Sequence, residues 1–351
     1  MPLTPPVSPV PHPCAAAVSS LARRSLLHAV TGLAAAAVLP AGAAQTAWPA
    51  VIEPAGPGAL DGVVVPGAAM RTVYTEGRWC EGPVWSPTDG GLVFSDVRSN
   101  RLMALRGGAD AQATVLRDPS NFSNGNALDR QGRLLSCEHG GRRVVRREAD
   151  GRLTVLADRH DGRRLNSPND LVVAPDGAVW FTDPVFGITQ PDEGFQAEPE
   201  QRGRYLFRLA PDGRLAVAAD GFDQPNGIAF APDFRTLYVS EAGAARDPDG
   251  GGREIRAFDV GSEGRLSRER RFARLDTGIP DGLKTDAAGR VYAATGDGVR
   301  IWAADSTLLG LVRTAAACGN LAFGGSDGRT LYVCSGPHIH ALALRSWAAW
   351  A

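Results

Sequence analysis

Several features that would mark common classes of protein are missing from this sequence. The formal net charge is only −1 over 351 residues, so the composition gives no sign of nucleic-acid or membrane-surface binding. No segment keeps a 3.6-residue apolar period over any length, which argues against long helices. No Cys-x-x-Cys spacing occurs, so a zinc–thiolate site is not expected.

The sequence is instead rich in turn-forming residues and has enough apolar residues for a full core. Forty-two Gly and twenty-five Pro favour many tight turns, and hydrophobic residues make up 44% of the chain. The length alone would allow two or three domains, but internal repetition overrides that expectation.

The first 45 residues have the pattern of an export signal. Arg23 and Arg24 precede an Ala-rich apolar stretch, and Ala41-Gly-Ala43 forms a small-residue cleavage site. The stretch from Ala29 to Ala44 is too short and too weakly apolar to be a comfortable membrane anchor, the alternative interpretation. We therefore expect a twin-arginine signal peptide over residues 1–45, an N-terminal extension over 46–68, and a periplasmic or secreted mature protein that no longer associates with the membrane.

Four cysteines remain after such a cleavage. An oxidising compartment permits disulfides, and Cys318 and Cys334 fall on neighbouring predicted strands. Cys80 and Cys137 have no evident partner and are expected to be buried, unpaired residues. Whether Cys318 and Cys334 pair is left open by the sequence.

One pattern repeats six times along the chain. A carboxylate or carboxamide residue opens a short apolar run, which breaks about seven residues later at a turn and is followed by a second run. We call these six residues the openers: Glu81, Asn124, Asn169, Asn226, Asp281 and Asn320. Six copies of one hairpin therefore place six oxygen-bearing side chains at equivalent positions.

The spacing of the repeat predicts a six-bladed β-propeller with four-stranded blades over residues 69–351. The residues that follow the openers lie 43, 45, 57, 55 and 39 positions apart, and strand–turn–strand units of this period are typical of propeller blades. A β-sandwich would also show short, regularly spaced strands, but it would not place a polar residue at the same point of every unit. A strand from Ala69–Thr75 is expected to close the ring against the last blade.

In such a propeller the openers converge at one mouth of the central channel. The second strand of each hairpin returns to that mouth, and the connections Gln190–Gly203 and Ala242–Arg253 follow second strands, so the extra length of the third and fourth blades lies where a lid would be useful. The residues that end the second strands are Asp96, Glu138 with His139, Asp183, Glu241 and Thr295.

The openers suit a hard cation. Carboxylates and amide oxygens are the ligands that Ca²⁺ and similar divalent ions prefer, and without a cation Glu81 and Asp281 would repel each other across a low-dielectric channel. A single Asn or Asp at a strand start would more often satisfy backbone groups. Six such residues at equivalent positions favour a ring of metal ligands.

These motifs resemble the SMP-30/gluconolactonase/luciferin-regenerating-enzyme family of six-bladed propellers, which includes the regucalcin-like lactonases. The resemblance covers about residues 75–345 and depends on the order and spacing of its motifs. These are Glu81-Gly-Pro-Val-Trp, Ser167-Pro-Asn-Asp170, Pro225-Asn-Gly-Ile and Ile279-Pro-Asp-Gly-Leu. It implies hydrolysis of an aldonolactone, with D-glucono-1,5-lactone as the model substrate, and one divalent metal held by Glu81, Asn226 and Asp281.

The resemblance also implies roles for further residues. Asn169 serves as a metal ligand or a substrate contact, and Asp281 is the general base that activates water, with Glu138 or His139 as the alternative base. Asn124, Asn169 and Asp183 are expected to contact the substrate.

The chain departs from its apparent relatives at two of these positions. Paraoxonase-type lactonases carry a histidine where Asn124 stands, so a histidine pair is not expected here. Animal members have Arg-x-Asn where this chain has Ser167-Pro-Asn169, so a sugar-binding arginine would have to come from elsewhere, such as Arg163 or Arg164.

Two other functions fit the same fold. One is a non-catalytic propeller that binds a protein or glycan through this face, and the other is a different propeller enzyme, such as a lyase or a strictosidine-synthase-like condensing enzyme. The intact set of openers favours the lactonase, with a small-molecule lactone as its partner and Ca²⁺ ahead of Zn²⁺, Mn²⁺ or Mg²⁺. A monomer or weak dimer is expected.

Overall fold

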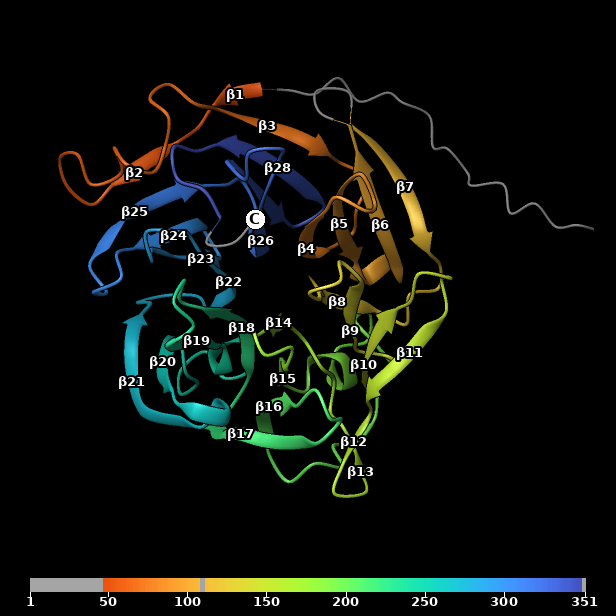
Figure 1. Cartoon of the computed structure of the whole chain (residues 1–351). Coiled ribbons are helices and arrows are strands. Elements are labelled where there is room, and N and C mark those ends of the chain that lie inside the picture. Colours follow the sequence, from red (N-terminus) through yellow and green to blue (C-terminus); the bar gives the residue numbers. More distant parts are fainter. Residues whose placement is uncertain (1–46, 108–110, 349–351) are drawn as a thin grey trace, which may run out of the picture. The chain divides into compact units, whose positions relative to one another are not determined.

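The chain folds as a six-bladed β-propeller, as the repeat predicted (Figure 1). The computed structural model describes residues 47–107 and 111–348, so the signal peptide predicted for residues 1–45 lies outside the described residues. Figure 1 shows β4, β8, β14, β18, β22 and β26, the innermost strands of the six blades, arranged around the central channel. Because each opener lies in or just before one of these strands, the fold brings the six openers together.

Each of the first five blades contains four consecutive antiparallel strands. The first blade contains β4 (Cys80–Ser86), β5 (Gly91–Asp96), β6 (Arg101–Arg106) and β7 (Gln112–Arg117), and the second β8 (Ser123–Leu128), β9 (Leu134–Glu138), β10 (Arg143–Arg147) and β11 (Leu153–Ala157). The third contains β14 (Leu171–Val173), β15 (Val179–Asp183), β16 (Arg204–Leu209) and β17 (Leu215–Phe222). The fourth contains β18 (Pro225–Phe230), β19 (Thr236–Glu241), β20 (Glu254–Val260) and β21 (Leu266–Arg274), and the fifth β22 (Pro280–Thr285), β23 (Val291–Thr295), β24 (Gly298–Trp302) and β25 (Leu308–Arg313).

The sixth blade closes the ring with strands from both ends of the described chain. Its three C-terminal strands are β26 (Cys318–Gly324), β27 (Thr330–Ser335) and β28 (His338–Ala343). Its fourth strand, β3 (Ala69–Tyr74), comes from the N-terminal side and pairs antiparallel with β28. The predicted closing strand is therefore confirmed. Because the first and last parts of the propeller share one sheet, no open edge is left between the first and last blades.

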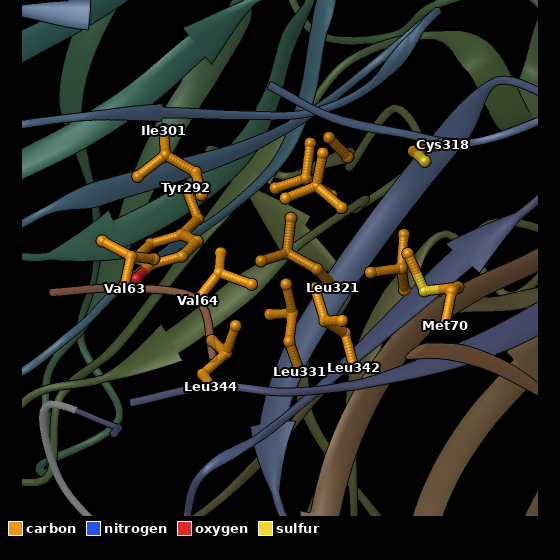
Figure 2. Close-up of a cluster of buried hydrophobic side chains, with 14 of the residues drawn as sticks. Val63, Val64, Met70, Tyr292, Ile301, Cys318, Leu321, Leu331, Leu342 and Leu344 are labelled. Carbon is orange, nitrogen blue, oxygen red and sulfur yellow. The ribbon is translucent and has the colours of Figure 1, made fainter. Parts of the chain in front are cut away.

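The N-terminal extension is part of the propeller fold, which the repeat did not predict. β1 (Ala47–Pro49) pairs with β3 and adds a fifth strand to the sixth blade, and β2 (Ile52–Pro54) pairs with β25 and adds a fifth strand to the fifth blade. Between β2 and β3 the chain buries Val63 and Val64 in a cluster with residues of both blades, such as Tyr292 and Leu331 (Figure 2). The extension thus adds apolar contacts to both blades.

Little helix is present in the described residues. The helical elements are the single turn α1 (Phe186–Thr189) and the short 3-10 turns η1 (Val97–Ser99), η2 (Gly243–Ala245) and η3 (Ser262–Gly264), and a small hairpin of β12 (Arg159–His160) and β13 (Arg163–Arg164) precedes the third blade. No helix among the described residues is long and apolar enough to cross a membrane.

The cysteines of the described part are all buried and free. In the sixth blade Cys318 lies opposite Ser335, and Cys334 lies opposite Asn320. Cys318 and Cys334, which could have formed a disulfide, are therefore not partners across the strands.

Candidate active site

A β-bulge marks the opener in most of the innermost strands. A bulge adds a residue to one strand and re-aims the side chains beside it, which is why bulges are common next to active sites. The pairing register shifts between Glu81 and Val84, Ser123 and Asn126, Pro225 and Ile228, Pro280 and Leu283, and Cys318 and Asn320. In the third blade Asn169 lies just before β14. A polar residue followed by glycine is the local sequence signal of most of these bulges.

Hydroxyl groups on the second strands hold the openers of neighbouring blades. Each hydroxyl comes from the residue before the last one of its strand and donates to the backbone carbonyl of the next opener at 2.7 Å. The pairs are Ser95 with Asn124, Thr182 with Asn226, and Ser240 with Asp281. These bonds fix where one blade's opener lies relative to the blade before it.

The other blade junctions also bring the openers close to one another. The amide of Gly125 donates to the carbonyl of Asn169 at 2.7 Å. A Cβ atom at Gly282 would collide with the side chain of Asn320, and one at Gly319 would collide with the carboxylate of Glu81. The openers therefore form a closed ring around the channel, which we call the opener ring.

Two acidic openers carry strongly shifted pKa values. Burial, together with the charges of Asp170 and Glu193, raises the pKa of Glu81 to about 8, although the amide of Gly82 opposes the shift. Burial raises the pKa of Asp281 well above its usual range, and the charges of Glu81, Glu193 and Asp170 add to the effect. The carboxylates at this end of the channel therefore repel one another when they are ionised.

His139 is buried beside this ring and uses both of its nitrogens. Its Nδ1 lies 3.0 Å from the backbone oxygen of Glu193, which can only accept, so Nδ1 carries the proton. Nε2 then accepts from the side-chain amides of Asn124 and Asn169, at 3.2 and 3.4 Å. Burial lowers the pKa of His139 to about 4, so the imidazole is neutral near pH 7. His139 thus orients two openers.

The side-chain amide of Asn124 contacts His139 through its nitrogen, which leaves its oxygen available to a ligand. This Oδ1 is buried and has no hydrogen-bond partner among the described residues. No group of three or more His, Cys, Asp or Glu side chains that could hold a metal occurs in the described ranges, so a cation would need amide oxygens beside Glu81 and Asp281. Two carboxylates with asparagine oxygens fit a hard divalent ion.

Glu138 and Asp183 are engaged within their own parts of the blades. The two carboxylate oxygens of Glu138 accept from Arg117 and Arg143, each at 2.6 Å. Asp183 accepts from the backbone amide of Asn166 at 2.8 Å, and burial raises the pKa of Asp183 to about 7. The structure therefore gives both carboxylates bracing contacts and does not bring them into the opener ring.

The same bracing recurs at the ends of other second strands. Asp96 accepts from the backbone amide of Arg78 at 2.9 Å, and Glu241 accepts from that of Gln224 at 2.8 Å. Each carboxylate fixes the chain that leads into the innermost strand of its blade. Since successive residues of a strand point to opposite sides, the neighbouring hydroxyls reach the ring while these acids do not.

Two acidic residues near the ring were not predicted as site residues from the sequence. Asp170 is buried directly after Asn169 and accepts from the amide of Asn320 at 3.4 Å. Glu193 lies in the loop after α1, where no periodic pattern could single it out. The position of Asp170 beside an opener was its one available signal.

Two other sequence features fall outside the ring. Arg163 and Arg164 belong to the β12–β13 hairpin, where Arg164 donates to the carbonyl of Gly141 at 3.1 Å. The string Gly324-Gly-Ser-Asp-Gly328 has the letters of a serine-hydrolase elbow, but it covers the end of β26 and the turn before β27. A strand-to-strand turn is the wrong setting for such a nucleophile.

The fold and the ring define a propeller protein with a polar site at one mouth of its channel. The chain belongs to the family described as the SMP-30/gluconolactonase/LRE-like region, whose profile matches residues 79–336.

Named relatives cover most of the chain. It is 31% identical over 304 residues to a gluconolactonase of Zymomonas mobilis subsp. mobilis, covering 80% of this chain and 82% of the relative. It is 32% identical over 274 residues to a pentonolactonase of Haloferax volcanii, covering 75% and 83%. A solved gluconolactonase from Xanthomonas campestris has a TM-score of 0.78 at 39% identity, covering 88% of this chain and 99% of that one.

Proposed function

We propose that this protein hydrolyses a sugar lactone at the opener ring, with D-glucono-1,5-lactone as the first substrate to test. The chain is a lactonase, an enzyme of the carboxylic ester hydrolase class, in keeping with its similarity to a gluconolactonase and a pentonolactonase. The observation that carries the proposal is the closed ring of openers, in which Glu81 and Asp281 lie near each other beside amide side chains.

The ring also supports a divalent cation as cofactor. We assign Glu81, Asn226 and Asp281 as its ligands, with Asn169 close by and the free amide oxygen of Asn124 as a further donor. An all-oxygen donor set favours Ca²⁺ over softer ions. When bound, the cation would polarise the lactone carbonyl and offset the repulsion between the two carboxylates.

Asp281 is suited to be the general base. It is only partly buried, unlike the other openers, and it receives a hydrogen bond from the Asn226 side chain. In the proposed reaction Asp281 takes a proton from the water that attacks the carbonyl carbon. The ring C–O bond then breaks, and Asp281 returns the proton to the leaving oxygen, so water and lactone give the hydroxy acid.

The neighbouring residues hold this arrangement rather than exchange protons. Both carboxylate oxygens of Glu138 already accept hydrogen bonds from arginines, Arg117 and Arg143. His139 offers no free lone pair, because Nε2 already accepts from Asn124 and Asn169. We therefore assign His139 as a positioning residue.

The experiment that tests the proposal is hydrolysis of a lactone panel followed with a pH indicator. The panel contains sugar, aliphatic and homoserine lactones, and Asp281→Asn is assayed beside the wild type. We expect the wild type to open sugar lactones and the variant to be much slower. A wild-type protein that opens no lactone would overturn the proposal.

We also propose that the protein works after export by the twin-arginine route. The support is the Arg23-Arg24 pair ahead of an apolar stretch and a small-residue cleavage site. The buried, free cysteines place no demand on the redox state of the compartment.

A further inference from the structure

The loop after α1 leaves the third blade and contacts residues of the first and second blades and of the segments that precede them. Its Asp192 lies 3.7 Å from Arg78, just before the first blade, and its Phe195 packs edge-on against Phe122, with ring centroids 5.2 Å apart. Its backbone oxygen at Glu193 accepts from His139. The loop therefore lies at the mouth of the channel where the openers meet.

Glu193 is the acidic residue that this loop buries. Arg98 donates to its Oε1 from Nη2 at 2.9 Å and from Nε at 3.3 Å. The guanidinium of Arg98 lies over the ring of Trp79, 4.9 Å from its centroid, so the arginine is itself held in place. No hydrogen bond between described residues ends on Oε2 of Glu193, which leaves that oxygen to accept from a ligand.

Glu193 also lies close to the opener ring. Its backbone oxygen is joined through His139 to the side chains of Asn124 and Asn169. Its charge contributes to the raised pKa values of Glu81 and Asp281. The loop does not depend on this carboxylate alone for its anchoring, since Phe195 and Asp192 also hold it. Loop anchoring alone therefore does not explain the carboxylate of Glu193, which Arg98 fixes beside the opener ring.

We propose that Glu193 is a specificity-determining residue that accepts hydrogen bonds from substrate hydroxyl groups. This inference rests on the proposed lactonase function and names a residue that would select sugar lactones over lactones without hydroxyl groups. An unsubstituted lactone would displace water from this carboxylate oxygen and offer it no hydrogen bond, and sites built to bind a hydroxyl discriminate strongly against analogues that lack it.

The test compares two lactones that share a six-membered ring. D-Glucono-1,5-lactone carries hydroxyl groups and δ-valerolactone carries none. For Glu193→Gln we expect KM for gluconolactone to rise roughly 10- to 100-fold with kcat little changed, as for a lost hydrogen bond to a charged group, and no loss on δ-valerolactone. Glu198→Gln, at an exposed position of the same loop, is the matched control and should leave both substrates unaffected.

Other outcomes would overturn the inference. A fall in kcat on both lactones would mean that Glu193 acts in the chemistry, and an unchanged KM would mean that it does not contact the substrate. Phe195→Ala loosens the loop but keeps the carboxylate, so an equal selective rise in KM there would assign the effect to loop closure. If the wild type does not open δ-valerolactone, the inference is tested on gluconolactone alone. There Glu193→Gln must raise KM and leave kcat little changed. A wild type that opens no lactone contradicts the proposed function itself.

Discussion

Glu81 raises the pKa of Asp281, although the two residues belong to the first and fifth blades. Burial makes the repulsion between their carboxylates costly, because a low-dielectric channel screens it poorly. We explain this pair as two ligands of one divalent cation.

Glu81→Gln should weaken metal binding, since it removes one charge and keeps the shape of the side chain. Metal content after dialysis, measured by mass spectrometry, checks this. Asp327→Asn is the matched control, because Asp327 is exposed in the β26–β27 turn. Equal metal content in the wild type and Glu81→Gln would contradict the ligand assignment.

The stability gained from calcium should grow with pH. The pKa of Glu81 is raised from 4.5 to about 8 in the metal-free fold, so its contribution to stability is full below pH 4.5 and is lost as pH rises through about 8. Asp281, shifted in the same direction, adds to this loss. We expect the increase in Tm on adding Ca²⁺ to be larger at about pH 9 than at about pH 5, because Ca²⁺ binds the ionised carboxylates. An equal increase at both values would count against the shared site.

The N-terminal extension should contribute to stability. Val63 is buried in the cluster of Figure 2, whereas Val65 is exposed. Val63→Asp should therefore lower the free energy of unfolding by about 3 kcal/mol or more, and Val65→Asp by less than about 0.5 kcal/mol. Denaturant unfolding measures both. Similar values for the two variants would show that the extension does not pack as described.

Export should depend on the paired arginines. Changing Arg23 and Arg24 together to Lys is expected to leave the protein unprocessed and inside the cell, while the mature wild type begins near Ala44 or Gln45. Mass spectrometry of periplasmic and cytoplasmic fractions measures this. Normal export of the double variant would reject the twin-arginine route.

The parts of the molecule that repeat could be predicted from the sequence. Each blade repeats the same polar opener and turn. The spacing of these repeats therefore predicted the blade count, the closing strand and the convergence of residues such as Glu81 and Asp281. The orientation of the acidic side chains at the ends of the second strands could not be predicted from spacing. Whether Glu138 or a neighbouring residue faces the channel depends on which face of the strand meets it.

Features that do not repeat were missed for a related reason. The Gln190–Gly203 connection was predicted to lie over the mouth, but that Glu193 is the residue it buries there depends on contacts with distant residues such as Arg98. Val63 and Val64 form part of the core, but they do so outside any blade pattern. Neither feature has a periodic signal.

The base assignment is tested by two variants at saturating metal. Asp281→Asn should lose about 10²–10⁴-fold in kcat, the usual cost of removing a general base. His139→Ala should be milder, because His139 orients Asn124 and Asn169 without exchanging protons. A nearly normal Asp281→Asn beside an inactive His139→Ala would make the histidine the base.

Whether the opener ring is a metal-dependent lactonase site is decided by the rate of D-glucono-1,5-lactone hydrolysis by metal-stripped protein as Ca²⁺ is added, corrected for spontaneous opening of the lactone. We predict a rate near background in excess EDTA and a saturable recovery with Ca²⁺, shifted to higher Ca²⁺ in Glu81→Gln. A full rate in excess EDTA would contradict this.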